Sequence, residues 1–193
     1  MLKFLFLHLS SLLLFPGLFA QKRSYTQPHT LGIHFIFNDF ETAAAIRSSS
    51  LSAVINDGRF GKLKDMSQGL ALSFGKGLSE NFDFYSTVAG SFLSYPLEGK
   101  APASGEYLLL EGDASIRGKL LSDRYFVVPY LQVGLGVSKY QGYWGTFIPA
   151  GIGVQINFFD EAYLQINSQY RVGVTETASY HFVHSIGLIG KLN

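Results

Sequence analysis

Six charged residues lie on the polar sides of predicted strands, and their chemistry is the first to consider. They are Asp83, Glu111, Asp113, Arg117, Arg171 and Lys191. If the polar sides of these strands enclose an interior, the charges must pair, because burying an unpaired charge is costly. The set therefore predicts a salt-bridged network that fills the lumen of a barrel. The alternative is a narrow gated pore, in which Arg117 or Arg171 opposes Glu111 or Asp113.

A histidine and serine group near the C-terminal end is the main candidate for catalysis. His181, His184 and Ser185 lie in one predicted strand. Successive strand side chains point to opposite faces, so His184 falls on the apolar side and Ser185 on the polar side. His184 therefore cannot activate Ser185 as a nucleophile. We expect no catalytic residues and no enzymatic activity.

Metal and cofactor sites are not expected either. His29 and His34 are five residues apart, with no carboxylate at ligand spacing. The pairs Gly134-x-Gly136 and Gly151-x-Gly153 alternate within strands and no helix follows them, so they are not nucleotide-binding loops. The chain has no cysteine, which excludes disulfides and thiolate chemistry.

The alternation of apolar and polar residues predicts the elements that position these groups. In residues 163–173, Leu164 and Ile166 lie on one side while Gln165 and Asn167 lie on the other. A period of two is typical of a strand. Eight such segments are predicted, near residues 30–39, 67–77, 81–94, 106–120, 124–138, 147–158, 163–173 and 179–192. Each supplies the roughly 9–11 residues that a tilted membrane strand needs.

The connections between these strands alternate in length. Short turns are predicted near 77–80, 122–123 and 159–161, and longer loops at 40–66, 95–105 and 139–146, with a shorter one at 174–178. This layout is typical of an outer-membrane barrel with periplasmic turns, external loops and both termini in the periplasm. Within loop 40–66 we expect some helix, with Asp39 as its cap.

Aromatic residues near both strand ends predict two belts at the membrane interfaces. Those near the short turns are Phe82, Phe84, Tyr125, Phe126, Phe158, Phe159 and Tyr163. Those near the longer loops are Tyr95, Tyr107, Tyr140, Tyr143, Trp144, Phe147, Tyr180 and Phe182. Pro129 lies inside the fifth strand with no amide hydrogen to donate, so we expect a bulge or a locally open ladder there.

Residues 1–20 predict a cleavable secretory signal peptide. Lys3 precedes an apolar run from Phe4 to Phe15, and Leu18-Phe19-Ala20 offers a cleavage site. The run is too short for a membrane-spanning helix. Residues 21–193 then form one barrel domain. The formal net charge of +1 falls to zero without Lys3, so no nucleic-acid partner is expected.

Several segments of the chain resemble the eight-stranded barrels of Bacteroidetes outer-membrane proteins, the kind found as the N-terminal domain of OmpA-type proteins. They are Gly32-Ile-His-Phe-Ile-Phe-Asn-Asp-Phe-Glu-Thr-Ala43, Gly69-Leu-Ala-Leu-Ser-Phe-Gly-Lys-Gly-Leu78 and Pro129-Tyr-Leu-Gln-Val-Gly-Leu-Gly136, together with residues 149–157 and 167–171. The resemblance implies an all-β fold, an eight-stranded antiparallel up-and-down transmembrane β-barrel. We expect no peptidoglycan-binding domain, because the chain stops at Asn193.

These observations predict a non-enzymatic scaffold of the cell outer membrane, whose external loops contact an unknown surface ligand. Its other expected partners are outer-membrane lipid and the barrel-assembly machinery, and no cofactor is expected. One alternative is a narrow pore for small solutes or ions. Another is a soluble periplasmic lipocalin-like carrier of an apolar ligand, with the apolar sides facing inward. A third is an enzyme acting on lipids.

Overall fold

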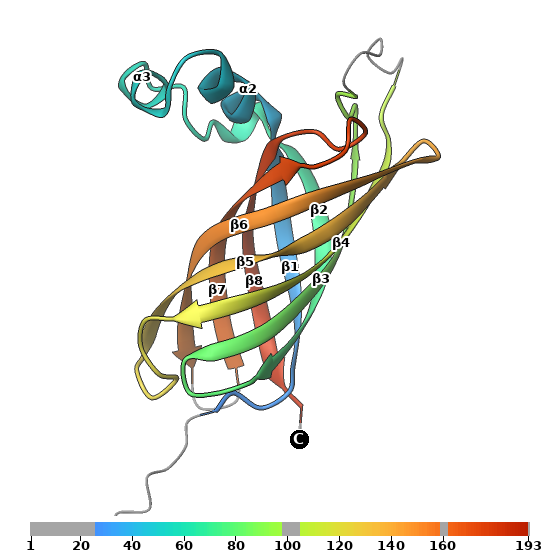
Figure 1. Ribbon diagram of the computed structural model, residues 1–193. Coiled ribbons are helices and arrows are strands. Elements are labelled where there is room, and N and C mark those ends of the chain that lie inside the picture. The colour runs from blue at the N-terminus through green and yellow to red at the C-terminus, as the bar shows by residue number, and fades with distance from the viewer. Residues whose placement is uncertain (1–25, 98–104, 159–161, 193) are drawn as a thin grey trace, which may run out of the picture.

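Eight antiparallel strands form a closed barrel in the computed structural model, which describes residues 26–97, 105–158 and 162–192. The strands are β1 (Thr30–Asp39), β2 (Ser67–Gly77), β3 (Phe82–Leu93), β4 (Tyr107–Lys119), β5 (Val127–Tyr140), β6 (Tyr143–Phe158), β7 (Ala162–Gly173) and β8 (His181–Lys191). Each strand pairs with its neighbour in the chain, and β8 closes on β1 (Figure 1). The predicted up-and-down barrel is confirmed. The predicted signal peptide and the turn at 159–161, with Phe159 of the predicted aromatic belt, lie outside the described residues, as does most of the predicted loop at 95–105.

The apolar sides of the strands face outward and the polar sides face the lumen. Leu135 is 71% exposed, and Ile33, Leu72, Val88 and Leu188 are each 62% exposed. The polar residues between them are buried, as the alternating burial of β4 and β5 shows. Successive side chains of a strand point to opposite faces. Once the apolar face of a strand is turned outward, each of its residues is therefore assigned either to the outer surface or to the lumen.

The two ends of the barrel differ (Figure 1). The end that carries α2 (Phe40–Ser48) and α3 (Leu51–Asn56) is called here the loop end. The opposite end, which carries the C-terminus, is called the turn end. The predicted helix in loop 40–66 is confirmed by α2 and α3. The predicted cap is also confirmed, because the Asp39 side chain accepts a hydrogen bond from the Thr42 amide at 2.8 Å. No helix in the described residues is long and apolar enough to cross a membrane.

The predicted loop at 139–146 is wrong. Strands β5 and β6 continue to Tyr140 and Tyr143, and the turn consists of Gln141 and Gly142 alone. Both have positive φ, 48° and 87°, as a tight hairpin turn between twisted strands requires. Glutamine rarely adopts a positive φ, so Gln141 did not indicate a tight turn. Gly142 fits the second position of such a turn well.

The predicted bulge at Pro129 is absent from the β5–β6 pairing, where Pro129 lies opposite Val154. The alternative, a locally open ladder, is found on the β4 side, where the described pairing ends at Tyr130 opposite Lys119. The β5–β6 register is the same on both sides of Pro129, from Val127 opposite Ile156 to Val133 opposite Ala150. Pro129 lies where β4 ends, and its carbonyl accepts a hydrogen bond from the Leu120 amide at 2.9 Å. The missing donor therefore falls at the end of a ladder, where it costs little.

The predicted aromatic belts are partly wrong. Trp144, Phe126, Phe82 and Tyr125 are exposed on the outer wall or its ends. In contrast, Tyr95, Tyr140, Phe147 and Tyr163 are at least 97% buried. The sequence shows that an aromatic residue lies near a strand end. Whether it faces outward or fills the lumen depends on the face of the strand to which its position belongs.

Candidate functional site

The lumen of the barrel holds three acidic and three basic side chains that are almost fully buried. They are Asp83, Glu111 and Asp113, and Arg117, Lys119 and Arg171, each 6% exposed or less. Glu111, Asp113, Arg117 and Lys119 alternate along β4, so a single strand contributes four of the six charges. Equal numbers of opposite charges allow the set to be neutral overall, as an enclosed interior requires.

At the turn end, Lys119 joins two carboxylates. Its Nζ lies 3.0 Å from Asp83 Oδ1 and 2.6 Å from Asp123 Oδ2. The Gln155 amide donates a further hydrogen bond to Asp123 at 3.1 Å. The sequence analysis missed Lys119. The available signal was its position two residues after Arg117, which puts both on the same face of β4.

In the middle of the lumen, Arg117 lies between two tyrosine rings. Its Cζ is 3.1 Å from the Tyr85 ring centroid and 4.5 Å from that of Tyr130. Its Nε donates to Gln132 Oε1 at 3.1 Å, and this oxygen also accepts from Asn167 at 2.8 Å. Stacking on aromatic faces and amide hydrogen bonds therefore stabilise this buried cation.

At the loop end, Arg171 contacts two carboxylates. Its Nη1 forms an ion pair and hydrogen bond with Glu111, and its Nη2 lies 3.5 Å from Asp113 Oδ2. His181 Nε2 lies 3.6 Å from the other oxygen of Glu111. The Arg171 guanidinium also lies 4.7 Å from the centre of the Phe147 ring. Strands β4, β6, β7 and β8 thus meet at this cluster.

An aromatic cap, made of Phe40, Tyr95 and Tyr140 with Leu93 and Leu109, closes the lumen above this cluster. Phe40 stacks on His181 with ring centroids 4.6 Å apart. The Tyr140 hydroxyl donates to the Leu93 carbonyl at 3.2 Å. Burial, with a smaller contribution from the negative charge of Glu111, raises the pKa of Tyr95 to about 12, so this hydroxyl stays neutral.

The described side chains leave little free space between Arg117 and Arg171. A cavity of about 20 Å³ lies among Tyr85, Arg117, Asn167 and Arg171. A buried cavity needs roughly 10–15 Å³ of accessible volume to hold one water molecule. The cavity therefore has room for about one water. It lies between Arg117 and Arg171.

The structure places five of the six predicted lumen residues in three groups. Asp83 pairs with Lys119 near the turn end, Arg117 lies in the middle, and Arg171 joins Glu111 and Asp113 near the loop end. Lys191 does not join these groups. It lies half-buried at the end of β8, with its Nζ 5.4 Å from the Tyr163 ring centroid.

The histidine and serine group is divided between the two faces of the wall. His184 lines a groove on the outer wall, and its Nε2 lies 3.9 Å from Asp39 Oδ2. Ser185 also lines the internal cavity. Ser168 is opposite His184 in the β7–β8 register, but the described residues include no hydrogen bond between these two side chains. These two side chains are therefore not joined as a nucleophile and its base would be.

Gly153 allows the Tyr130 ring to lie flat against the barrel wall. A Cβ atom at Gly153 would lie 2.4 Å from Tyr130 Cζ. We expect Gly153→Ala to destabilise the folded barrel by about 1–3 kcal/mol, since crowding a packed core has this cost. Urea unfolding in lipid vesicles measures the change. Gly90→Ala is the control, because a Cβ there meets its nearest atom at 3.6 Å, and equal losses for the two variants would contradict the packing described here.

No family model matches the chain, and no curated protein matches its sequence. Solved structures match its fold. The N-terminal β-barrel domain of Pseudomonas aeruginosa OprF is 9% identical with a TM-score of 0.54, over 86% of this chain and 98% of that one. The outer membrane protein OprG of the same organism is 8% identical with a TM-score of 0.56, over 87% and 97%. Ail, the attachment invasion locus protein of Yersinia pestis, is 11% identical with a TM-score of 0.51, over 85% and 97%.

These identities are low, so the similarity establishes the fold alone. It extends over nearly the whole length of each neighbour, so no large part of their barrels is missing here. The chain therefore has the closed eight-stranded barrel fold of these proteins.

Proposed function

We propose that this protein is an integral outer-membrane barrel that acts as a non-enzymatic scaffold and presents external loops for surface interaction. The observation that carries the proposal is the orientation of the wall. Exposed aliphatic side chains surround the barrel, while the charged and amide side chains are enclosed. A closed ladder leaves no unpaired strand edge, which is the condition for a sheet to cross a bilayer.

The outward-facing apolar wall is also evidence against the alternative of a soluble lipocalin-like carrier. A lipocalin-like protein needs an apolar lumen with room for its ligand and a polar surface in water. Here the lumen is filled by ion pairs around a cavity of about 20 Å³, and residues such as Leu135 and Ile152 are exposed on the outside.

The filled lumen also favours a scaffold over the narrow pore. An ion crossing the barrel would have to pass the Arg171 cluster and the aromatic cap above it. Breaking such a pair leaves a buried charge without its partner, which costs several kcal/mol. The described residues therefore support a closed lumen at rest.

The proposed partners follow from this placement. Lipid of the outer membrane would contact the apolar wall, and the barrel-assembly machinery would insert the chain. A surface ligand would meet α2, α3 and the other connections at the loop end, since loops on a rigid barrel commonly carry binding sites. Among the proteins of similar fold, Ail has been solved in complex with the heparin analogue sucrose octasulfate. The Bacteroidetes origin stays a prediction.

Gel mobility of purified protein, with and without boiling, tests the proposal. We expect the unboiled sample to migrate faster, because a closed ladder in lipid or detergent resists unfolding by the gel detergent. Identical mobility, together with recovery of the native protein in detergent-free buffer, would contradict a membrane barrel. In planar bilayers we expect no stable conductance steps from the wild-type protein, and regular ohmic steps that change in Arg171→Ala would favour the pore.

A further inference from the structure

The segment from Leu51 to Met66, called here the rim segment, exposes apolar side chains at the loop end of the barrel. It contains α3 and the short 3-10 helix η1 (Leu63–Asp65). Leu63 is 68% exposed, Ile55 56%, Leu51 50% and Phe60 41%. Leu51 and Ile55 are four residues apart in α3 and share one face of it. Apolar side chains clustered on an exposed loop are typical of a surface that contacts a partner or a membrane.

The rim segment is joined to the outer wall of the barrel. The Phe60 ring lies 5.8 Å from that of Phe182 and 6.4 Å from that of His184, measured between centroids. Both partners are on the outward face of β8. Figure 1 shows α3 beyond the edge of the barrel mouth. The exposed apolar side chains of the rim segment therefore continue the apolar surface of the wall.

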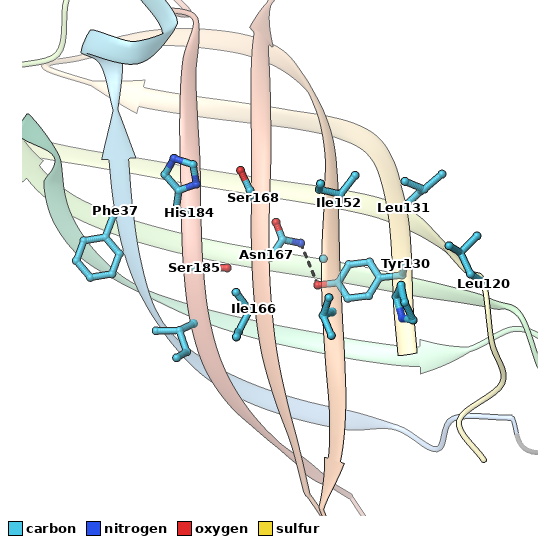
Figure 2. Close-up of a pocket in the computed structure, with 14 residues that line it drawn as sticks. Phe37, Leu120, Tyr130, Leu131, Ile152, Ile166, Asn167, Ser168, His184 and Ser185 are labelled. Atoms are coloured by element: carbon cyan, nitrogen blue, oxygen red, sulfur yellow. Dashed lines mark hydrogen bonds between the residues drawn. The ribbon is translucent and has the colours of Figure 1, made fainter. Parts of the chain in front are cut away.

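A groove of about 610 Å³ runs along the outer wall next to this junction. Figure 2 shows it across β5, β6, β7 and β8, with Phe37 of β1 at one side. Leu131, Ile152 and Ile166 form its apolar walls, and the small Ser168 beside His184 leaves it open. Because His184 also contacts Phe60, the groove reaches the rim segment.

Basic residues accompany the exposed apolar side chains of the rim segment. Arg59, Lys62 and Lys64 are exposed, against Asp57 and Asp65. Arg59 pairs with Asp57 at 3.1 Å. Lys62 and Lys64 flank Leu63, the most exposed apolar residue of the segment. Cations beside exposed aliphatic side chains are typical of a segment that lies at an anionic lipid surface.

We propose that the groove and the rim segment together bind an anionic phospholipid from the surrounding leaflet. An acyl chain would lie along the groove between Leu131 and His184, and the phosphate of the headgroup would contact Lys62 and Lys64. This inference rests on the proposed membrane location. It adds one lipid-specific site to an outer wall whose other parts contact lipids without distinguishing between their headgroups.

Native mass spectrometry of the folded protein in detergent tests this site with two lipids that share acyl chains. We expect dioleoyl-phosphatidylglycerol to bind at least about tenfold more tightly than dioleoyl-phosphatidylcholine, since each basic residue near an anionic lipid contributes about 1 kcal/mol, or fivefold. The variant Lys62→Gln/Lys64→Gln should reduce this preference to within about twofold. The control Lys76→Gln/Arg124→Gln removes two exposed charges at the turn end and should keep it.

A second pair of variants tests the groove. Ser168→Phe fills it and should weaken phosphatidylglycerol binding at least about fivefold, the equivalent of about one buried methylene or slightly more. Ser86→Phe is the matched control, because Ser86 lines a comparable groove of about 650 Å³ on another part of the wall. Free glycerol phosphate should not displace the lipid at comparable concentration, because it lacks the acyl chain.

The outcomes separate this inference from the proposed function. Equal binding of the two lipids, an equal loss in either control, or displacement by free glycerol phosphate overturns the lipid site. If the protein shows the gel-mobility shift but no lipid preference, the lipid site is wrong and the proposed function stands. If it shows neither the shift nor insertion into vesicles, the lipid site and the membrane barrel are both wrong.

Discussion

Replacing Arg171 with methionine is expected to lower the free energy of unfolding by about 3–5 kcal/mol, the cost of removing one partner from a buried ion pair. Arg171 is the base that contacts both Glu111 and Asp113, and all three side chains are buried. Without it, two carboxylates lie close together in the lumen without the guanidinium that pairs with both of them. Urea unfolding in lipid vesicles, followed by tryptophan fluorescence, measures the loss.

Two further variants show whether the loss is electrostatic. Arg59→Met breaks an exposed pair with Asp57 and should cost less than about 1 kcal/mol. Neutralising the whole cluster, with Arg171→Met, Glu111→Gln and Asp113→Asn, should recover most of the stability, because a neutral packed interior has no uncompensated charge. If the triple variant is as unstable as Arg171→Met, the loss comes from packing around Phe147 and not from charge.

A charge on the outer wall should have an effect of similar size for a different reason. Val133 is 57% exposed on β5 and lies between Ile116 and Ala150 of the neighbouring strands. Val133→Arg should lower the free energy of unfolding in vesicles by about 2–4 kcal/mol if this position faces the middle of the bilayer. The measurement is again equilibrium unfolding in lipid.

The control for Val133→Arg is Val174→Arg. Val174 is 61% exposed in the connection between β7 and β8, at the loop end. A charge near the interface costs about 0–1 kcal/mol. Similar costs at the two positions would show that the wall does not face hydrocarbon, since water would solvate arginine equally at both.

The sequence alone was sufficient for the strand count, the strand faces and the helix in loop 40–66. These depend on local patterns: alternation, the Asp39 cap and the exclusion of charge from one face. It also placed Asp83, Glu111, Asp113, Arg117 and Arg171 on one side of their strands, where the structure has them.

The pairing of these charges could not be predicted, because it depends on the stagger between strands that are far apart in the chain. Arg171 and Glu111 are separated by 60 residues and lie on strands that are not neighbours. Their contact crosses the lumen, so it follows from the closure of the barrel. The burial of Tyr140 could not be predicted either, because the β5–β6 hairpin is longer than its sequence pattern indicated.

The orientation of the apolar wall toward lipid is tested most directly by spin labels on single cysteines, since the chain has no native cysteine. Leu135→Cys reports on the outer wall, where Leu135 is 71% exposed, and Glu176→Cys reports on an exposed loop position. In lipid vesicles we predict frequent collisions of the Leu135→Cys label with oxygen, which concentrates in hydrocarbon, and few with a water-soluble nickel complex. The Glu176→Cys label should show the reverse. Equal access of the nickel complex to both labels would contradict the membrane barrel.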